Sequence, residues 1–163
     1  MQMNNIQEIR RLSFGLSDNE SSELFKTEII ARCSGNSSEV LEKTKEGLKI
    51  VINCELSFDD PVDDWEAVLP KWFVDACSPE ISKEEAEELL KTGQGFETLS
   101  NMWTVSGFIY WFRPDQRSWY WWDGVTKDLN TLKIYLLVNG FPFAWGALEF
   151  LLKAAGVNSV EQV

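Results

Sequence analysis

The chain has 163 residues, of which 44% are hydrophobic and 13% aromatic, and it carries a net charge of −11. This length is typical of one domain, and so many large apolar side chains exclude intrinsic disorder. The strongly acidic balance disfavours nucleic acid and anionic membrane surfaces as partners.

The three cysteines, Cys33, Cys54 and Cys77, are an odd number and form no CxxC pair. This spacing predicts free thiols in a reducing compartment, with no zinc site. No stretch of the sequence approaches the roughly 18 apolar residues of a membrane span, and no signal peptide is recognisable at the N-terminus. We therefore expect a cytoplasmic protein.

The first predicted elements alternate between strand and helix. Apolar and polar side chains alternate over residues 25–33, which predicts a half-buried strand. A capping-box spacing opens residues 37–46 as a short helix, and Gly47 is expected to end it. Clean alternation over residues 48–58 then predicts a second strand.

The middle of the chain is predicted to be helical and acidic. Asp60 is expected to cap a helix over residues 61–69, and Pro70 separates it from a second helix over residues 71–77. A third helix is expected over residues 83–91, with its two leucines turned toward the core. Between Glu55 and Glu97 there are 13 acidic residues and three lysines, a local charge of −10.

The C-terminal part carries six of the eight tryptophans. Residues 102–112 and 117–122 are rich in β-forming side chains, and the four residues between them have turn chemistry, which predicts a hairpin. Its aromatic side chains fall on both faces, so both faces need a cover. A turn is expected at Asp123 and Gly124.

A strand over residues 132–138 and a helix over residues 143–155 complete the predicted elements. The helix is apolar around almost all of its circumference, so we expect it to be central and buried. Together these patterns predict a single α+β domain over residues 1–163, with residues 15–23 and 157–163 loose. Its mainly antiparallel sheet of about five strands would contain the Trp-rich hairpin and be covered by helices.

Catalytic and cofactor motifs are missing from the sequence. There is no histidine and no glycine-rich phosphate loop, so we expect no cofactor, no metal and no enzyme activity of the commoner kinds. Asp115 and Asp123 are the one pair of carboxylates in an aromatic setting, which could support acid-base chemistry. Both also fit the ends of turns, which explains them without catalysis.

The acidic segment is the first candidate for function. Dispersed carboxylates would serve solubility, whereas a concentrated field of one sign accelerates the capture of a basic protein partner. A solvated helical face remains the plainer explanation. The candidate binding residues are Asp59, Asp60, Asp63, Asp64, Glu66, Glu84, Glu85, Glu87 and Glu88.

The aromatic hairpin is the second candidate. It could form a cleft that binds a small molecule or carbohydrate, or that holds the carboxylates of an enzyme. It could equally be core, or join two copies of the chain in a homo-oligomer. The candidate cleft residues are Trp111, Arg113, Asp115, Arg117, Trp119, Trp121, Trp122 and Asp123.

In class, this small, acidic, Trp-rich chain is similar to the bacterial immunity proteins that neutralise toxins. The likeness is one of composition and expected fold, without a shared motif. It implies a non-enzymatic interaction protein, in agreement with the first candidate.

Overall fold

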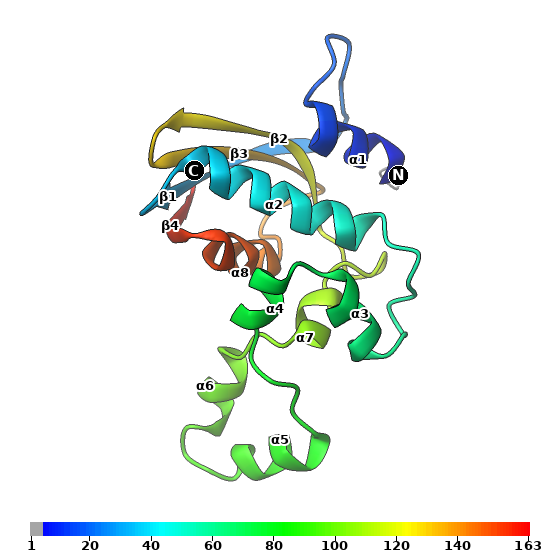
Figure 1. Ribbon diagram of the computed structural model, residues 1–163, viewed down its shortest axis with the longest axis vertical. Helices are drawn as coiled ribbons and strands as arrows, with labels where there is room; N and C mark the ends of the chain where they lie inside the picture. The colour runs from blue at the N-terminus through cyan, green and yellow to red at the C-terminus, as the bar shows by residue number, and fades with distance from the viewer. Residues whose placement is uncertain (1–4) are drawn as a thin grey trace.

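The four strands form one antiparallel sheet in the order β2-β3-β1-β4 in the computed structural model (Figure 1). The structure describes residues 5–163, apart from the side chain of Ser100. The α+β class predicted from the sequence is confirmed, with four strands in place of about five. The strands are β1 (Phe25–Cys33), β2 (Trp119–Asp128), β3 (Thr131–Val138) and β4 (Val157–Gln162).

Eight helices are present in residues 5–163. They are α1 (Asn5–Phe14), α2 (Ser37–Ile52), α3 (Val62–Val68), α4 (Lys71–Ala76), α5 (Lys83–Leu90), α6 (Gly95–Ser100), α7 (Val105–Tyr110) and α8 (Gly146–Ala155). None of them is both long enough and apolar enough to cross a lipid bilayer. The predicted helices in the acidic middle are confirmed, each within a few residues of its expected bounds.

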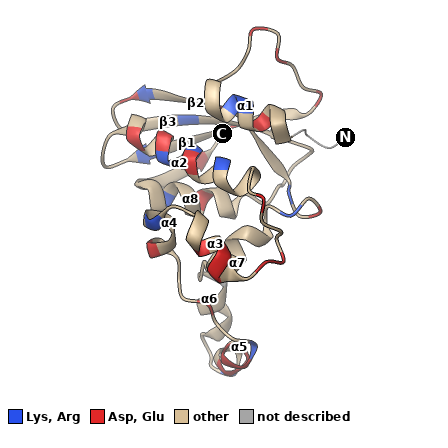
Figure 2. Ribbon diagram, turned by 45° about the vertical axis from the view of Figure 1, so that its right-hand side comes forward, with Lys and Arg blue, Asp and Glu red and all other residues tan. Residues whose placement is uncertain are grey.

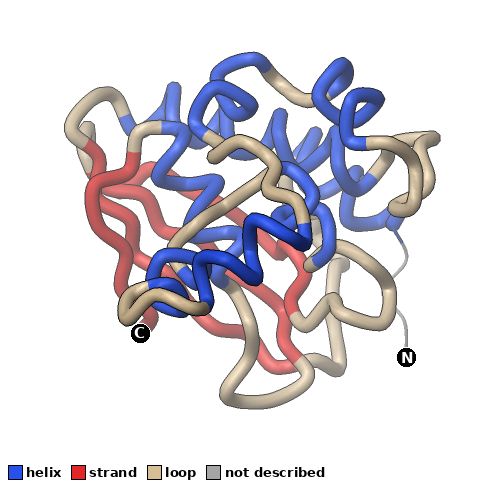
Figure 3. The backbone as a smooth tube through the Cα atoms, turned by 90° about the horizontal axis from the view of Figure 1, so that it is seen from below, coloured by secondary structure: helices blue, strands red, loops and turns tan. Residues whose placement is uncertain are grey.

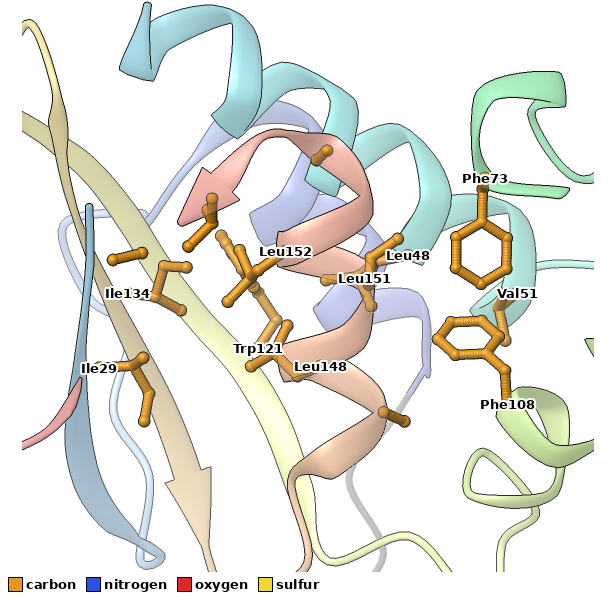
Figure 4. Packing of buried hydrophobic residues seen from close by; sticks show 14 of the residues in the cluster. Ile29, Leu48, Val51, Phe73, Phe108, Trp121, Ile134, Leu148, Leu151 and Leu152 are labelled. Atoms are coloured by element: carbon orange, nitrogen blue, oxygen red, sulfur yellow. The ribbon is translucent and has the colours of Figure 1, made fainter. Parts of the chain in front are cut away.

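The helices gather on one face of the sheet, and the core lies between them and the strands (Figure 3). Ile29 of β1 and Ile134 of β3 point toward Leu148 and Leu152 of α8, and Leu48 of α2 packs against α8 (Figure 4). The expectation of a central buried C-terminal helix is therefore confirmed, although α8 begins at Gly146 and not at residue 143.

The predicted strand over residues 48–58 is wrong, because α2 continues through Gly47 to Ile52. The buried positions of α2 recur at helical spacing: Val40, Leu41, Thr44, Gly47, Leu48 and Val51. Gly47 is not a C-cap. A Cβ there would lie 3.0 Å from Cδ1 of Leu151, so the glycine allows α2 and α8 to approach closely.

The predicted strand over residues 102–112 is also wrong. Residues 105–110 form α7, whose N-cap Thr104 accepts a hydrogen bond from the backbone N of Gly107 at 3.0 Å. The buried apolar residues Val105, Phe108, Ile109 and Phe112 follow the i, i+3, i+4, i+7 spacing of a helix. The Trp-rich strand β2 pairs instead with β3.

The predictions for residues 25–33 and 132–138 are confirmed by β1 and β3. Asp123 and Gly124 do not form a turn, because they lie inside β2 where its register with β3 shifts. Residues 157–162 are not loose, because they form β4 along the edge of β1. Residues 15–23 contain neither helix nor strand.

Candidate functional site

The acidic segment is exposed over most of its length. Asp59, Asp63, Asp64 and Glu66 lie on or before α3 with exposed side chains, while Asp60 is half-buried. Asp60 does not cap α3, whose first turn follows Pro61; its carboxylate accepts a hydrogen bond from the backbone N of Ser57 at 2.8 Å. Figure 2 shows these carboxylates along the loop and helix in front of α7.

Most of the candidate carboxylates have no ion-pair partner among the described residues. Two are paired: Asp59 with Arg113 at 2.6 Å and Glu88 with Lys91 at 2.9 Å. The hydrogen bond that Arg113 donates to the Asp59 carboxylate raises the pKa of the guanidinium. Within residues 5–163 the remaining candidate acids form no salt bridge, namely Asp60, Asp63, Asp64, Glu66, Glu84, Glu85 and Glu87.

Helices α5 and α6 pack against each other and project from the body of the molecule as a helical arm, residues 82–100 (Figures 1 and 2). Ser82 caps α5 by accepting a hydrogen bond from the backbone N of Glu85 at 3.1 Å. No residue of α5 is buried, and Leu90 is 53% exposed, so the expectation that both leucines face the core is wrong. Phe96 of α6 is 78% exposed.

The arm is not packed into the core, and its shape depends on Gly95. A Cβ at this position would lie 1.5 Å from the backbone oxygen of Leu89. Only glycine allows α6 to turn back so closely against the end of α5. Most of the surface of the arm faces solvent.

The tryptophans of β2 are buried in the structure. Trp119 and Trp121 belong to the main hydrophobic core, and Trp119 meets the ring of Phe112 edge-on at 5.8 Å. Trp122 is also buried, beneath Arg11 and Lys26, whose cationic groups lie 5.3 and 4.6 Å from its ring centre. Trp111 is half-buried at the edge of the core.

The two aspartates of the predicted aromatic cleft do not lie together in one cavity. Asp115 is exposed in the connection between α7 and β2, whereas Asp123 is half-buried within β2 and accepts a hydrogen bond from the backbone N of Gly124. Three cavities in the described part of the chain are lined by neither aspartate. No group of three or more potential metal ligands occurs in residues 5–163.

A buried cluster of four charged residues joins α1 to the outer edge of β2, and the sequence patterns do not reveal it. Glu8, which is fully buried, accepts two hydrogen bonds of 2.6 Å from Arg117 and one of 2.7 Å from the backbone N of Trp121. Arg11 donates twice to the backbone oxygen of Trp121 and once to Glu20. The cluster thus satisfies the backbone N and O of Trp121 on this edge strand.

Glu20 completes the charge balance of this cluster. Burial raises the pKa of its carboxyl group, but hydrogen bonds from Ser17 and Arg11 together with the charge of Arg11 outweigh that effect, so its pKa lies below the ordinary value. The two arginines and two glutamates then neutralise one another. The only trace of this cluster in the sequence is that Glu8 and Arg11 interrupt the apolar side of α1, which Ile9 and Leu12 form. That trace does not identify the partners of the two charges.

The three thiols are free, as predicted, but only Cys33 is buried, while Cys54 and Cys77 are half-buried. Burial, together with the nearby charges of Glu80 and Glu66, raises the pKa of the Cys77 thiol to about 12. Burial also raises the pKa of Cys33.

We expect iodoacetamide to label Cys54 of the native protein first at pH 8. Cys33 and Cys77 should react at least about tenfold more slowly, because the thiolate is the reactive species and burial suppresses it. Peptide mass spectrometry of samples quenched at successive times measures the three rates. Denatured protein, in which all three thiols should react alike, is the control, and equal rates in the native protein would contradict the buried placements.

Comparison of the chain with models of known protein families, with curated proteins and with solved structures finds no match.

Proposed function

We propose that the chain is a non-enzymatic interaction protein whose acidic surface, on α3 and on the helical arm, binds a basic protein partner. The observation that carries this proposal is the arm itself, a projection that combines exposed carboxylates with exposed apolar side chains. Burial of Trp119, Trp121 and Trp122 supports it further, since these three rings offer no exposed aromatic surface to a ligand.

The charge on α5 favours a recognition role over solubility alone. Glu84, Glu85, Glu87 and Glu88 occupy four of five consecutive positions, and Glu84 lies four residues from Glu88 and three from Glu87. Like charges at these spacings on a helix are mutually destabilising. Dispersed carboxylates would give solubility without that cost, whereas a concentrated field steers a cationic partner toward the arm.

The apolar residues on the arm supply what charge alone does not. Leu90 of α5 and Phe96 of α6, the helix that packs against α5, both expose large apolar areas. An apolar centre with a charged rim is the usual anatomy of a protein interface, in which a few large side chains carry most of the binding energy. The partner would then offer an apolar pocket flanked by lysine or arginine.

A charge-neutralising variant tests the proposal. Replacing Glu84, Glu85, Glu87 and Glu88 by glutamine should leave the melting temperature unchanged or slightly higher, because like-charge repulsion is removed. Its association rate with a partner captured from the native lysate should fall by about tenfold at low salt. Added salt should slow the wild-type association steeply, because exposed charges are screened over about 8–10 Å. Stopped-flow measurements at low and high salt give these rates.

A matched control separates the local field of the arm from net charge. Replacing the exposed Glu39, Glu42, Glu46 and Glu55 by glutamine changes net charge equally but leaves the arm intact. Association should slow much less in this variant. If both quadruple variants slow association equally, or if neither salt nor the arm substitutions affect it, the arm is not the docking element.

A further inference from the structure

A cavity of about 430 Å³ opens beside the C-terminal end of α2, well within the size range of small-molecule sites. Its walls include Ile52 from α2, Leu56 and Phe58 from the segment after α2, and Phe112 from the connection before β2. None of the residues that line it belongs to α3 or to the helical arm. It is therefore separate from the acidic surface.

One wall of this cavity contains a charged side chain that does not use all of its hydrogen-bond donors. Arg117 lines it, and only 6% of the Arg117 side chain is exposed. Both terminal nitrogens donate to Glu8, yet Nε of Arg117 has no hydrogen-bond partner among the described residues. A buried donor without an acceptor is unfavourable, and native proteins retain few of them.

The guanidinium is held in place by aromatic rings that also face the cavity. Its Cζ atom lies 4.8 Å from the ring centre of Tyr120 and 5.6 Å from that of Phe112, and both residues line the cavity. Among the described residues, Arg117 is the single charged one that lines the cavity. A rigid guanidinium in an otherwise neutral wall of mixed polar and apolar character fixes where a ligand would place its polar group.

We propose that this cavity is a binding site for a small amphipathic molecule, about the size of two or three rings, that presents an acceptor oxygen to Arg117. Apolar residues of the wall such as Ile52, Leu56 and Phe58 would pack against the ring system, and the oxygen would meet a guanidinium N–H that Glu8 does not use. The site does not depend on the proposed docking of a basic protein.

Two fluorescent probes that differ by one acidic group test this assignment. Anilinonaphthalene sulfonate carries acceptor oxygens on an aromatic body, and phenylnaphthylamine is its neutral counterpart. The wild-type protein should bind the sulfonate saturably at one site per chain and more tightly than the neutral probe. Bound sulfonate should also slow iodoacetamide labelling of Cys54, which lines the cavity, without changing the labelling of Cys77, which does not.

Three variants locate the site. Leu56→Trp should fill the cavity and weaken binding of both probes by at least about tenfold. Leu90→Ser removes an exposed apolar side chain of the arm and should leave binding of both probes unchanged. This result would show that the probes do not bind to the apolar surface of the arm. Arg117→Lys keeps a positive charge beside Glu8 but lacks the planar guanidinium and its additional N–H groups. It should therefore reduce the preference for the sulfonate over the neutral probe by about tenfold.

The measurements distinguish specific binding in the cavity from non-specific binding of the dye. Circular dichroism and thermal melting show which variants fold, and Cys54 protection in the wild-type protein needs no variant. Absence of Cys54 protection, undiminished binding to Leu56→Trp, or an unchanged probe preference in folded Arg117→Lys would each overturn the proposal.

Discussion

Replacing Glu8 by alanine should lower the free energy of unfolding by about 3–5 kcal/mol, one of the two largest effects we expect from a single substitution. The change leaves the charge of Arg117 without its partner in a site where only 6% of that side chain is exposed. It also removes the acceptor for the backbone N of Trp121. Chemical denaturation followed by tryptophan fluorescence measures the loss.

Two comparisons show whether burial is the cause. Asp75→Ala breaks the exposed Lys71–Asp75 pair, 2.6 Å long, and should cost no more than about 1 kcal/mol. A double variant, Glu8→Leu with Arg117→Leu, removes both buried charges and should be more stable than the sum of the two single losses predicts. If Glu8→Ala costs no more than Asp75→Ala, the buried cluster does not hold α1 to the sheet.

Two strands were predictable from the sequence, because alternation over residues 25–33 and the apolar run of residues 132–138 each became the expected strand. Residues 48–58 also alternate cleanly, but the helical spacing of the buried residues from Val40 to Val51 extends α2 to Ile52. Residues 102–112 fit two periods at once. Their aromatic side chains suggested a strand, while Val105, Phe108, Ile109 and Phe112 followed the helical spacing that tertiary packing selected.

Other features depend on partners that are distant in the chain. Glu8 and Arg117 are 109 positions apart, so no local pattern links them. Strand β4 is short, and most of its side chains are polar or exposed, because it lies at the sheet edge and gains its order from pairing with β1. Such an edge strand has little hydrophobic pattern of its own to detect.

The candidate sites were predictable to different degrees. Concentration of carboxylates in the middle of the chain is visible in the sequence, but the projection that carries Glu84 to Glu88 is not, because Leu89 and Leu90 suggested burial of α5. Arg117 was selected as a flank of an aromatic hairpin. In the structure it instead joins α1 to β2 and lines a cavity whose apolar walls come from residues 51–58 and 112–114.

Replacing Trp121 by alanine should also cost about 3–5 kcal/mol, because the cavity left by a large buried side chain is only partly refilled. Trp121 is fully buried, and Figure 4 shows it beside Leu148 of α8. The ring also covers Gly124, where a Cβ would lie 2.6 Å from Cζ2 of Trp121. We therefore expect the melting temperature to fall by roughly 10 °C.

Two further substitutions separate lost volume from lost polarity at this position. Nε1 of Trp121 has no hydrogen-bond partner in the described residues, so Trp121→Phe removes an unsatisfied donor and keeps most of the apolar volume. It should be much less destabilising than Trp121→Ala. Trp111→Ala, at a half-buried ring, should also cost less. Equal losses for Trp121→Ala and Trp111→Ala, measured by thermal and chemical unfolding, would contradict the placement of Trp121 at the centre of the core.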